Sequence, residues 1–135
     1  MRVRVLCMST VFAALVAAAT PLLAHHSFSA EYDDKKPLTL TGTVNKIEWL
    51  NPHARFYVDV KEPDGQLVTW EFELGSPNQL TRRGWRRTTL KIGDAVTVNG
   101  YPAKDGAHLA NARTVTMANG QRIFSGSAGD GGPEK

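Results

Sequence analysis

Residues 38–74 read LTLTGTVNKIEWLNPHARFYVDVKEPDGQLVTWEFEL, and this stretch organises the rest of the chain. Over residues 38–44, apolar or small side chains alternate with polar ones, the period of a β-strand with one buried face. The alternation then slips by one position before Ile47 and Trp49. A slip of one turns later side chains to the opposite face, so we expect a bulge or sharp bend. A bent first strand that contains a glycine, here Gly42, favours a small closed barrel.

The second half of this stretch predicts an antiparallel hairpin. Residues 56–60 and 68–74 both alternate, and Pro63-Asp64-Gly65 between them has the residues of a tight turn. One face of this hairpin is apolar and the other is charged. On the charged face, Glu71 and Glu73 could serve acid–base chemistry, but pairing with Arg55 or Lys61 on the neighbouring strand is the favoured reading.

The remaining elements complete a recognisable order. Ser76-Pro77 predicts the start of a short helix that runs to about residue 83 and ends at Gly84. Further strands are expected at residues 95–101, 107–117 and 121–124. Three strands, a short helix and further strands are the order of an OB-type barrel. We therefore predict a mostly β fold, a small OB-like antiparallel barrel of about five to six strands with one short helix between strands 3 and 4. An open meander is the alternative.

The two ends of the chain differ from this domain, residues 38–124. Residues 1–24 have a basic start and an apolar stretch too short to span a bilayer comfortably, which indicates a Sec-type signal peptide. Cleavage after Ala24 is preferred, with residues 17–19 as a competing site. The mature protein is then periplasmic or secreted, without a stable membrane anchor. Residues 25–37 are expected to form an N-terminal arm, either pinned to the barrel or loose. The glycine-rich residues 125–135 are expected to be disordered.

Charge and motifs narrow the function classes. The chain has 135 residues and a formal net charge of +3, which falls to about +1 when Arg2 and Arg4 leave with the signal. Cys7, the single cysteine, lies in the signal as well, so the mature chain has no thiol ligand and no disulfide. Export and the small net charge predict that nucleic acid is not a partner. No nucleophile elbow, phosphate loop or zinc-protease motif occurs, so we predict no enzyme activity.

Several motifs in register resemble a family of small exported bacterial proteins that is catalogued as a domain of unknown function. They are His25-His26-Ser27-Phe28, Asn51-Pro52-His53-Ala54, Arg82-Arg83-Gly84-Trp85 and Gly100-Tyr101-Pro102-Ala103. The resemblance covers essentially all of the mature chain. It implies an exported OB-like β domain and supplies neither an activity nor catalytic residues.

Histidines are the candidate metal ligands. Cleavage after Ala24 makes His25 the N-terminus, where its amine and ring chelate one ion together with His26 or His53. Such nitrogen donors suit Cu(II), Ni(II) or Zn(II). If Ala24 stays as the first residue, His26 is third and a square-planar copper or nickel site results. The competing interpretation is that His25 and His26 are solvated and that His53 is a hydrogen-bonded turn residue.

A second candidate surface surrounds the end of the helix. Arginines cluster there beside Trp85, and such a cluster binds phosphate or an acidic partner, although helix-end capping also explains it. The candidate residues for ligand or partner binding are Trp49, Asn51, Arg82, Arg83, Trp85 and Arg86. The leading hypothesis is an exported module that binds a small ligand, namely a divalent transition metal. The alternative is a non-catalytic envelope module that binds a protein or anionic partner through the cluster at residues 82–87.

Overall fold

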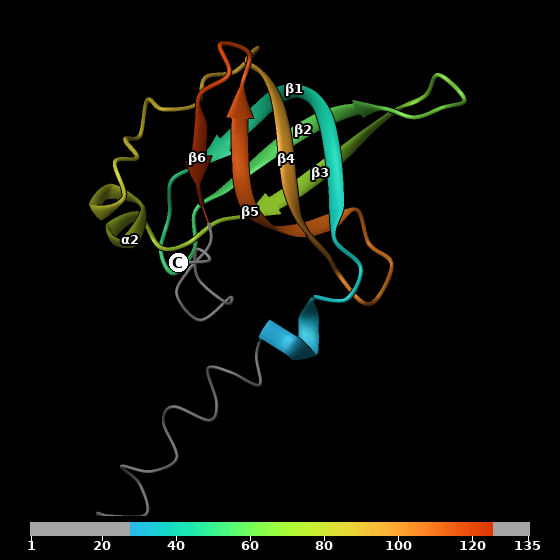
Figure 1. Ribbon diagram of the computed structural model, residues 1–135, viewed down its shortest axis with the longest axis horizontal. Helices are drawn as coiled ribbons and strands as arrows, with labels where there is room; N and C mark the ends of the chain where they lie inside the picture. The colour runs from blue at the N-terminus through green and yellow to red at the C-terminus, as the bar shows by residue number, and fades with distance from the viewer. Residues whose placement is uncertain (1–27, 126–135) are drawn as a thin grey trace, which may run out of the picture.

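The computed structural model describes residues 28–125, which fold around a strongly curved sheet (Figure 1). Its elements are β1 (Leu38–Glu48), β2 (Arg55–Lys61), β3 (Leu67–Glu73), α2 (Pro77–Arg82), β4 (Ala95–Pro102), β5 (Leu109–Met117) and β6 (Arg122–Phe124). The strand order is β3-β2-β1-β4-β5-β6, and a further pairing joins β3 to β5. That pairing is parallel, whereas all the others are antiparallel.

The β3–β5 pairing closes five strands into a barrel, and β6 extends the sheet beyond β5. The helix α2 lies in the connection between β3 and β4. This is the strand order and helix position of an OB-type barrel. The prediction of an OB-like barrel is confirmed, and the open meander is not the observed arrangement.

The strand β1 bends, and this allows it to pair on both sides. Its first half pairs with β4, and its second half with β2. The register with β2 shifts between Val44 and Lys46, where the sequence pattern predicted a slip. A Cβ atom at Gly42 would lie 2.2 Å from the Asp59 carbonyl oxygen, so the close approach of β2 requires a glycine there.

The hairpin and the helix follow the local sequence. The strands β2 and β3 pair in continuous register from Arg55↔Glu73 to Lys61↔Leu67. Ser76 caps α2 by accepting a hydrogen bond from the Gln79 backbone N–H, in a reciprocal capping box. Gly84 follows the helix with a φ of 91°, a conformation that glycine adopts without steric cost. The strands predicted at 95–101, 107–117 and 121–124 correspond to β4, β5 and β6, with boundary shifts of up to two residues.

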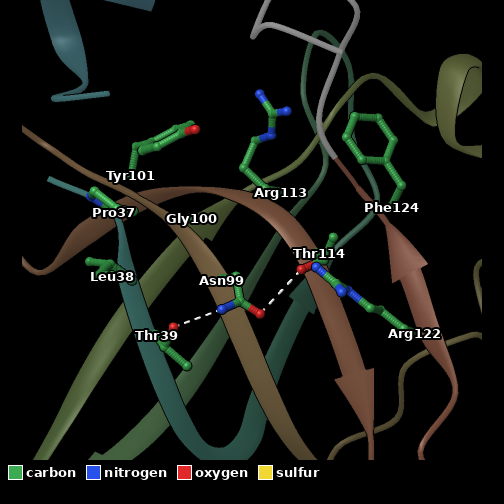
Figure 2. Close-up of a pocket in the computed structure, with 10 residues that line it drawn as sticks. All are labelled: Pro37, Leu38, Thr39, Asn99, Gly100, Tyr101, Arg113, Thr114, Arg122 and Phe124. Carbon is green, nitrogen blue, oxygen red and sulfur yellow. Dashed lines mark hydrogen bonds between the residues drawn. The ribbon is translucent and has the colours of Figure 1, made fainter. Parts of the chain in front are cut away.

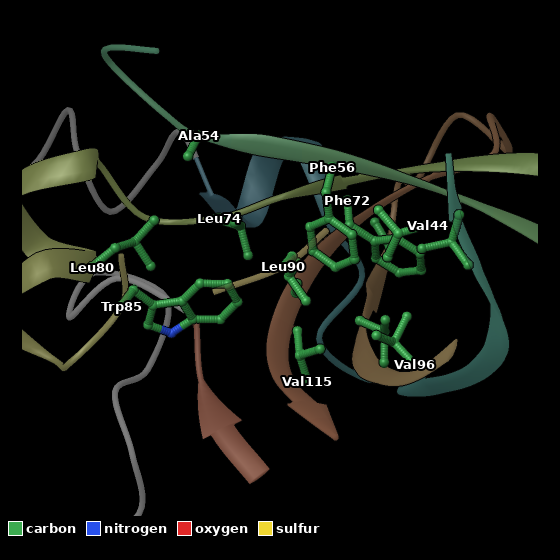
Figure 3. Close-up of a cluster of buried hydrophobic side chains, with 14 of the residues drawn as sticks. Val44, Ala54, Phe56, Phe72, Leu74, Leu80, Trp85, Leu90, Val96 and Val115 are labelled. Atoms are coloured by element: carbon green, nitrogen blue, oxygen red, sulfur yellow. The ribbon is translucent and has the colours of Figure 1, made fainter. Parts of the chain in front are cut away.

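The core fills the barrel and continues beneath α2 (Figure 3). Phe56 and Phe72 stack with their ring centroids 5.2 Å apart. Trp85 is only 1% exposed, and its Nε1 donates a hydrogen bond to the Phe124 carbonyl oxygen at 3.0 Å. The alternation of residues 68–74 predicts that Trp70 is a core residue, yet Trp70 is only partly buried and packs against the side of the cluster. Trp85 is buried instead, because the turn after α2 returns the chain to Leu80, whose carbonyl oxygen accepts a hydrogen bond from the Trp85 backbone N–H.

The segment that precedes β1 contacts the barrel. Tyr32 is buried and forms an isolated β-bridge with Ala103. Phe28 packs on Tyr32 and on Tyr101, with ring centroids 5.3 Å and 6.2 Å apart. These contacts hold residues 28–33 beside the loop between β4 and β5. The predicted signal peptide and most of the predicted glycine-rich tail lie outside the described residues.

Candidate functional site

One outward face of the barrel, on β2, β3 and the second half of β1, contains charges of both signs in direct contact. Arg55 Nη1 lies 3.0 Å from Glu71 Oε1, and Arg55 Nη2 lies 3.6 Å from Glu73 Oε2. Farther along this face, Lys46 Nζ lies 2.6 Å from Glu48 Oε1. The favoured reading of the two glutamates as partners of Arg55 is thus what the geometry shows. We call this surface the paired face.

Glu73 is the most enclosed carboxylate of the paired face, with a side chain only 13% exposed. Burial raises its pKa above the ordinary value, and nearby Glu31 adds to the rise, whereas His53 and Arg55 oppose it. Burial, together with the Glu73 charge, also raises the pKa of the Tyr32 hydroxyl. Glu73 on the barrel and Tyr32 in the segment before β1 are therefore close enough to influence each other's pKa.

The opposite outward face, on β1, β4, β5 and β6, contains a groove of about 520 Å³ (Figure 2). Its lining residues are Pro37, Leu38, Thr39, Asn99, Gly100, Tyr101, Arg113, Thr114, Arg122 and Phe124. Two arginines are among them, and no aspartate or glutamate is. A groove lined by cations without carboxylates favours an anionic ligand. We call this surface the groove face.

Arginines and aromatic rings alternate along one wall of the groove. The Arg113 guanidinium lies 5.6 Å from the centroid of the Tyr101 ring and 5.6 Å from that of Phe124. The Arg83 guanidinium lies over the same Phe124 ring, 4.3 Å from its centroid. Cation–π contacts hold a guanidinium in place while leaving its charge on the protein surface. The wall is thus a positively charged surface with fixed side chains.

A bulge in β5 presents Arg113 to the groove. Asn99 pairs with Thr114 and the next residue, Gly100, pairs with Ala112, which makes Arg113 the extra residue. Bulges re-aim a side chain in this way. A Cβ atom at Gly100 would lie 2.1 Å from the Asn111 carbonyl oxygen, so the bulge also requires a glycine on β4.

The floor of the groove is a polar row across β1, β4 and β5. Asn99 Nδ2 donates a hydrogen bond to Thr39 Oγ1 at 2.7 Å, and Thr114 Oγ1 donates to Asn99 Oδ1 at 3.2 Å (Figure 2). The amide orientation of Asn99 is assigned from this network. The floor therefore carries hydroxyl groups beside the cationic wall.

The histidine site predicted from the sequence is not assembled by the described residues. His53 is 39% exposed, and its Nδ1 lies 3.0 Å from the Leu74 carbonyl oxygen and 3.3 Å from Glu73 Oε1. This is the hydrogen-bonded position that the competing interpretation gave it. Across residues 28–125, no group of three histidine, cysteine, aspartate or glutamate side chains could hold a metal ion. His25 and His26 lie outside the described residues, so their metal site stays a prediction.

The predicted arginine surface separates into several environments. Trp85 is in the core and cannot contact a partner, because its indole is enclosed and hydrogen-bonded. The Arg83 guanidinium lies over the ring of Phe124, whereas Arg82 and Arg86 are exposed at the end of α2. Trp49 is partly buried against the core, and Asn51 is exposed at a corner with a cis peptide bond to Pro52.

The groove residues were missed by the sequence patterns. Arg113, Arg122 and Phe124 come from two strands, and nothing in their spacing indicates that they meet. One signal was available, because β4, β5 and β6 contain no aspartate or glutamate while two of these strands contain an arginine. Such a bias in charge across neighbouring strands indicates a cationic face.

A family model described as "Family of unknown function (DUF6152)" matches residues 13–112. The chain belongs to this family. No curated protein matches the sequence. Among solved structures, this chain is similar to Rim1, a mitochondrial single-stranded DNA binding protein from S. cerevisiae. The two chains are 10% identical, the TM-score is 0.48, and the match covers 62% of this chain and 93% of that one. This likeness concerns the fold alone.

The prediction that nucleic acid is not a partner is wrong as an exclusion, because a protein described as binding single-stranded DNA has a similar fold. It relied on the net charge of the whole mature chain, and that quantity averages the two faces. The cations of the groove face are balanced by carboxylates elsewhere on the molecule. Separately, no helix within residues 28–125 has the length and apolar character needed to cross a membrane.

Proposed function

We propose that this DUF6152 protein is a non-catalytic binding module that acts after export and captures a small anionic ligand in the groove. The observation that carries the proposal is the contrast in charge between the faces. On the paired face, Arg55 already contacts two carboxylates. In the groove, Arg113 and Arg122 are part of a lining that has no carboxylate.

Arginine suits this role for a physical reason. The guanidinium group has several N–H donors in a planar fork, which matches the oxygens of a carboxylate or phosphate. Each charge-assisted hydrogen bond of this kind contributes roughly 1.5–3 kcal/mol. The groove volume of about 520 Å³ is also within the usual range for small-molecule sites.

The test is a calorimetric titration of the exported protein with inorganic phosphate and with citrate. Arg122→Gln should weaken binding about tenfold or more, because it removes one charge-assisted contact. Arg86→Gln is the matched control, since it removes the same charge from an exposed position outside the groove lining. We expect it to change the affinity less than about twofold.

Three outcomes would contradict the proposal. The first is that neither anion binds. The second is that the two variants weaken binding equally, which would indicate a general effect of charge. A short single-stranded oligonucleotide that binds through Arg122 while small anions do not would replace the small ligand by a nucleic acid.

The metal hypothesis remains a separate prediction on His25 and His26, with His53 as third ligand. Its test is the intact mass and metal content of protein exported natively and purified without chelator. A chain that begins at His25 and carries near-stoichiometric copper, nickel or zinc would support it. A different N-terminus, or a protein that ignores added metal, would end it.

A further inference from the structure

We propose that the anion bound in the groove is a polyol, such as a sugar phosphate or a sugar acid. This inference rests on the anion-binding function proposed above and adds the class of ligand. It comes from the polar floor of the groove, which a simple anion would leave unused.

The hydrogen bonds of the floor have a direction. Thr39 Oγ1 accepts from the Asn99 amide, so the hydroxyl hydrogen of Thr39 remains available to donate. Thr114 Oγ1 donates its hydrogen to Asn99, so its lone pairs remain available to accept. The part of the chain that the structure describes gives neither hydroxyl a further side-chain partner. With this amide orientation, the floor offers a hydroxyl donor at Thr39 and hydroxyl lone pairs at Thr114.

A ligand hydroxyl both donates and accepts, and a row of hydroxyls matches such a floor. Thr39, Asn99 and Thr114 are in register on three neighbouring strands, so the row crosses roughly 10 Å of sheet. Arg113 and Arg122 line the same groove. A polyol can thus place its hydroxyls on the floor while its anionic group contacts an arginine.

The neighbouring row on the same face provides a comparison. Thr41 and Thr97 share a hydrogen bond of 2.9 Å, but neither lines the groove. They have the same chemistry and a similar place on the pleated sheet, but they lie outside the groove lining. If the threonines on this face only stabilise the pairing of the strands, substitution of either row should have the same effect on ligand affinity.

The test compares ligands that share a six-membered ring and an anionic group and differ chiefly in hydroxyl groups. Glucose 6-phosphate is titrated against cyclohexylmethyl phosphate, and glucuronate against cyclohexanecarboxylate, by calorimetry on the purified protein. We expect the polyol of each pair to bind about tenfold more tightly, as two neutral hydrogen bonds would provide. The polyol that binds more tightly identifies whether the groove prefers a phosphate or a carboxylate.

Two double variants assign this preference to the floor. Thr39→Val/Thr114→Val should reduce the affinity ratio within each ligand pair to about one, because valine has the same shape without the hydroxyl. Thr41→Val/Thr97→Val is the matched control and should retain the ratio. Unchanged thermal unfolding of both variants excludes loss of the fold.

The outcomes separate this inference from the function on which it rests. If simple anions and polyol anions bind equally through Arg122, the polyol inference is wrong and the anion module stands. If the affinity ratio within each ligand pair is unchanged in Thr39→Val/Thr114→Val, the floor does not bind the ligand hydroxyls and the inference is equally wrong. If no anion binds in any variant, the proposed function itself is wrong.

Discussion

The two outward faces of this barrel use charged side chains in opposite ways. On the paired face, Arg55 contacts Glu71 and Glu73, and these charges hold neighbouring strands together. On the groove face, Arg113 and Arg122 line a concave surface without a carboxylate. The same residue type therefore pairs with carboxylates on one face, and on the other it lines the groove that we propose as an anion site.

This difference begins in the sequence of the strands. Among the strands of the paired face, β2 and β3 carry Asp59, Glu71 and Glu73, whereas β4, β5 and β6 carry no acidic residue. Neighbouring strands bring their outward side chains together. Strands that carry both signs of charge therefore form ion pairs, whereas strands that carry only arginines give the surface a positive electrostatic potential. The net charge of each face therefore indicates the class of binding partner better than the net charge of the whole chain does.

The largest effect is expected at Gly42, where β1 passes from one face to the other. Gly42→Ala would place its Cβ against the Asp59 carbonyl oxygen, 2.2 Å away in the present structure. We expect the free energy of unfolding in urea to fall by about 3 kcal/mol, since backbone must move to relieve the overlap.

Gly65→Ala is the control, because a Cβ there has no neighbour within 4 Å but the residue has a φ of 87°. It should cost only about 1 kcal/mol. Equal effects of both substitutions would mean that β1 does not need its bend to join the two faces.

A crossed pair of substitutions tests the comparison of the faces directly. Arg55→Gln should lower the free energy of unfolding by about 1 kcal/mol, because the partly buried Glu73 loses a cationic partner. Arg122→Gln should leave it within about 0.5 kcal/mol, since Arg122 is exposed. Phosphate titration should show the reverse order. A destabilised Arg122→Gln with normal phosphate binding would remove the distinction between the faces.

The smallest effect is a change of stability with pH. Burial holds the pKa of Glu73 above its ordinary value of 4.5, so the folded state binds this proton more tightly than the unfolded state. The stability that Glu73 contributes is therefore complete below pH 4.5 and is lost as the pH rises through the raised pKa. Glu73→Gln removes this dependence.

We expect the free energy of unfolding of Glu73→Gln, minus that of the wild type, to increase from about pH 4 to about pH 7. Urea denaturation at several pH values measures it. A difference that decreases over this range would show that Arg55 and His53 outweigh the burial of the carboxylate.

Much of the fold could be predicted because its signals are local. The alternation of β2 and β3, the slip in β1 and the cap at Ser76 each depend on a few adjacent residues, and all three appear in the structure. The order of the elements then led to the barrel. The exposure of the tryptophans could not be predicted in this way, because it depends on which element covers each side chain.

The candidate site could not be predicted for a related reason. Arg113 and Phe124 lie on different strands, and the bulge that directs Arg113 into the groove depends on pairing with Gly100. The sequence drew attention instead to arginines that are adjacent along the chain. Of that cluster, Arg83 packs on the Phe124 ring and Trp85 belongs to the core, so adjacency in sequence did not correspond to one surface.

The most direct test of the groove as an anion site is a phosphate titration of the ¹⁵N-labelled protein followed by NMR. We predict that amide shifts change in a saturable way around Asn99, Arg113 and Arg122 and stay constant along β2 and β3. Saturable changes confined to residues 82–87, or no saturable change at all, would contradict the assignment of the groove face to ligand binding.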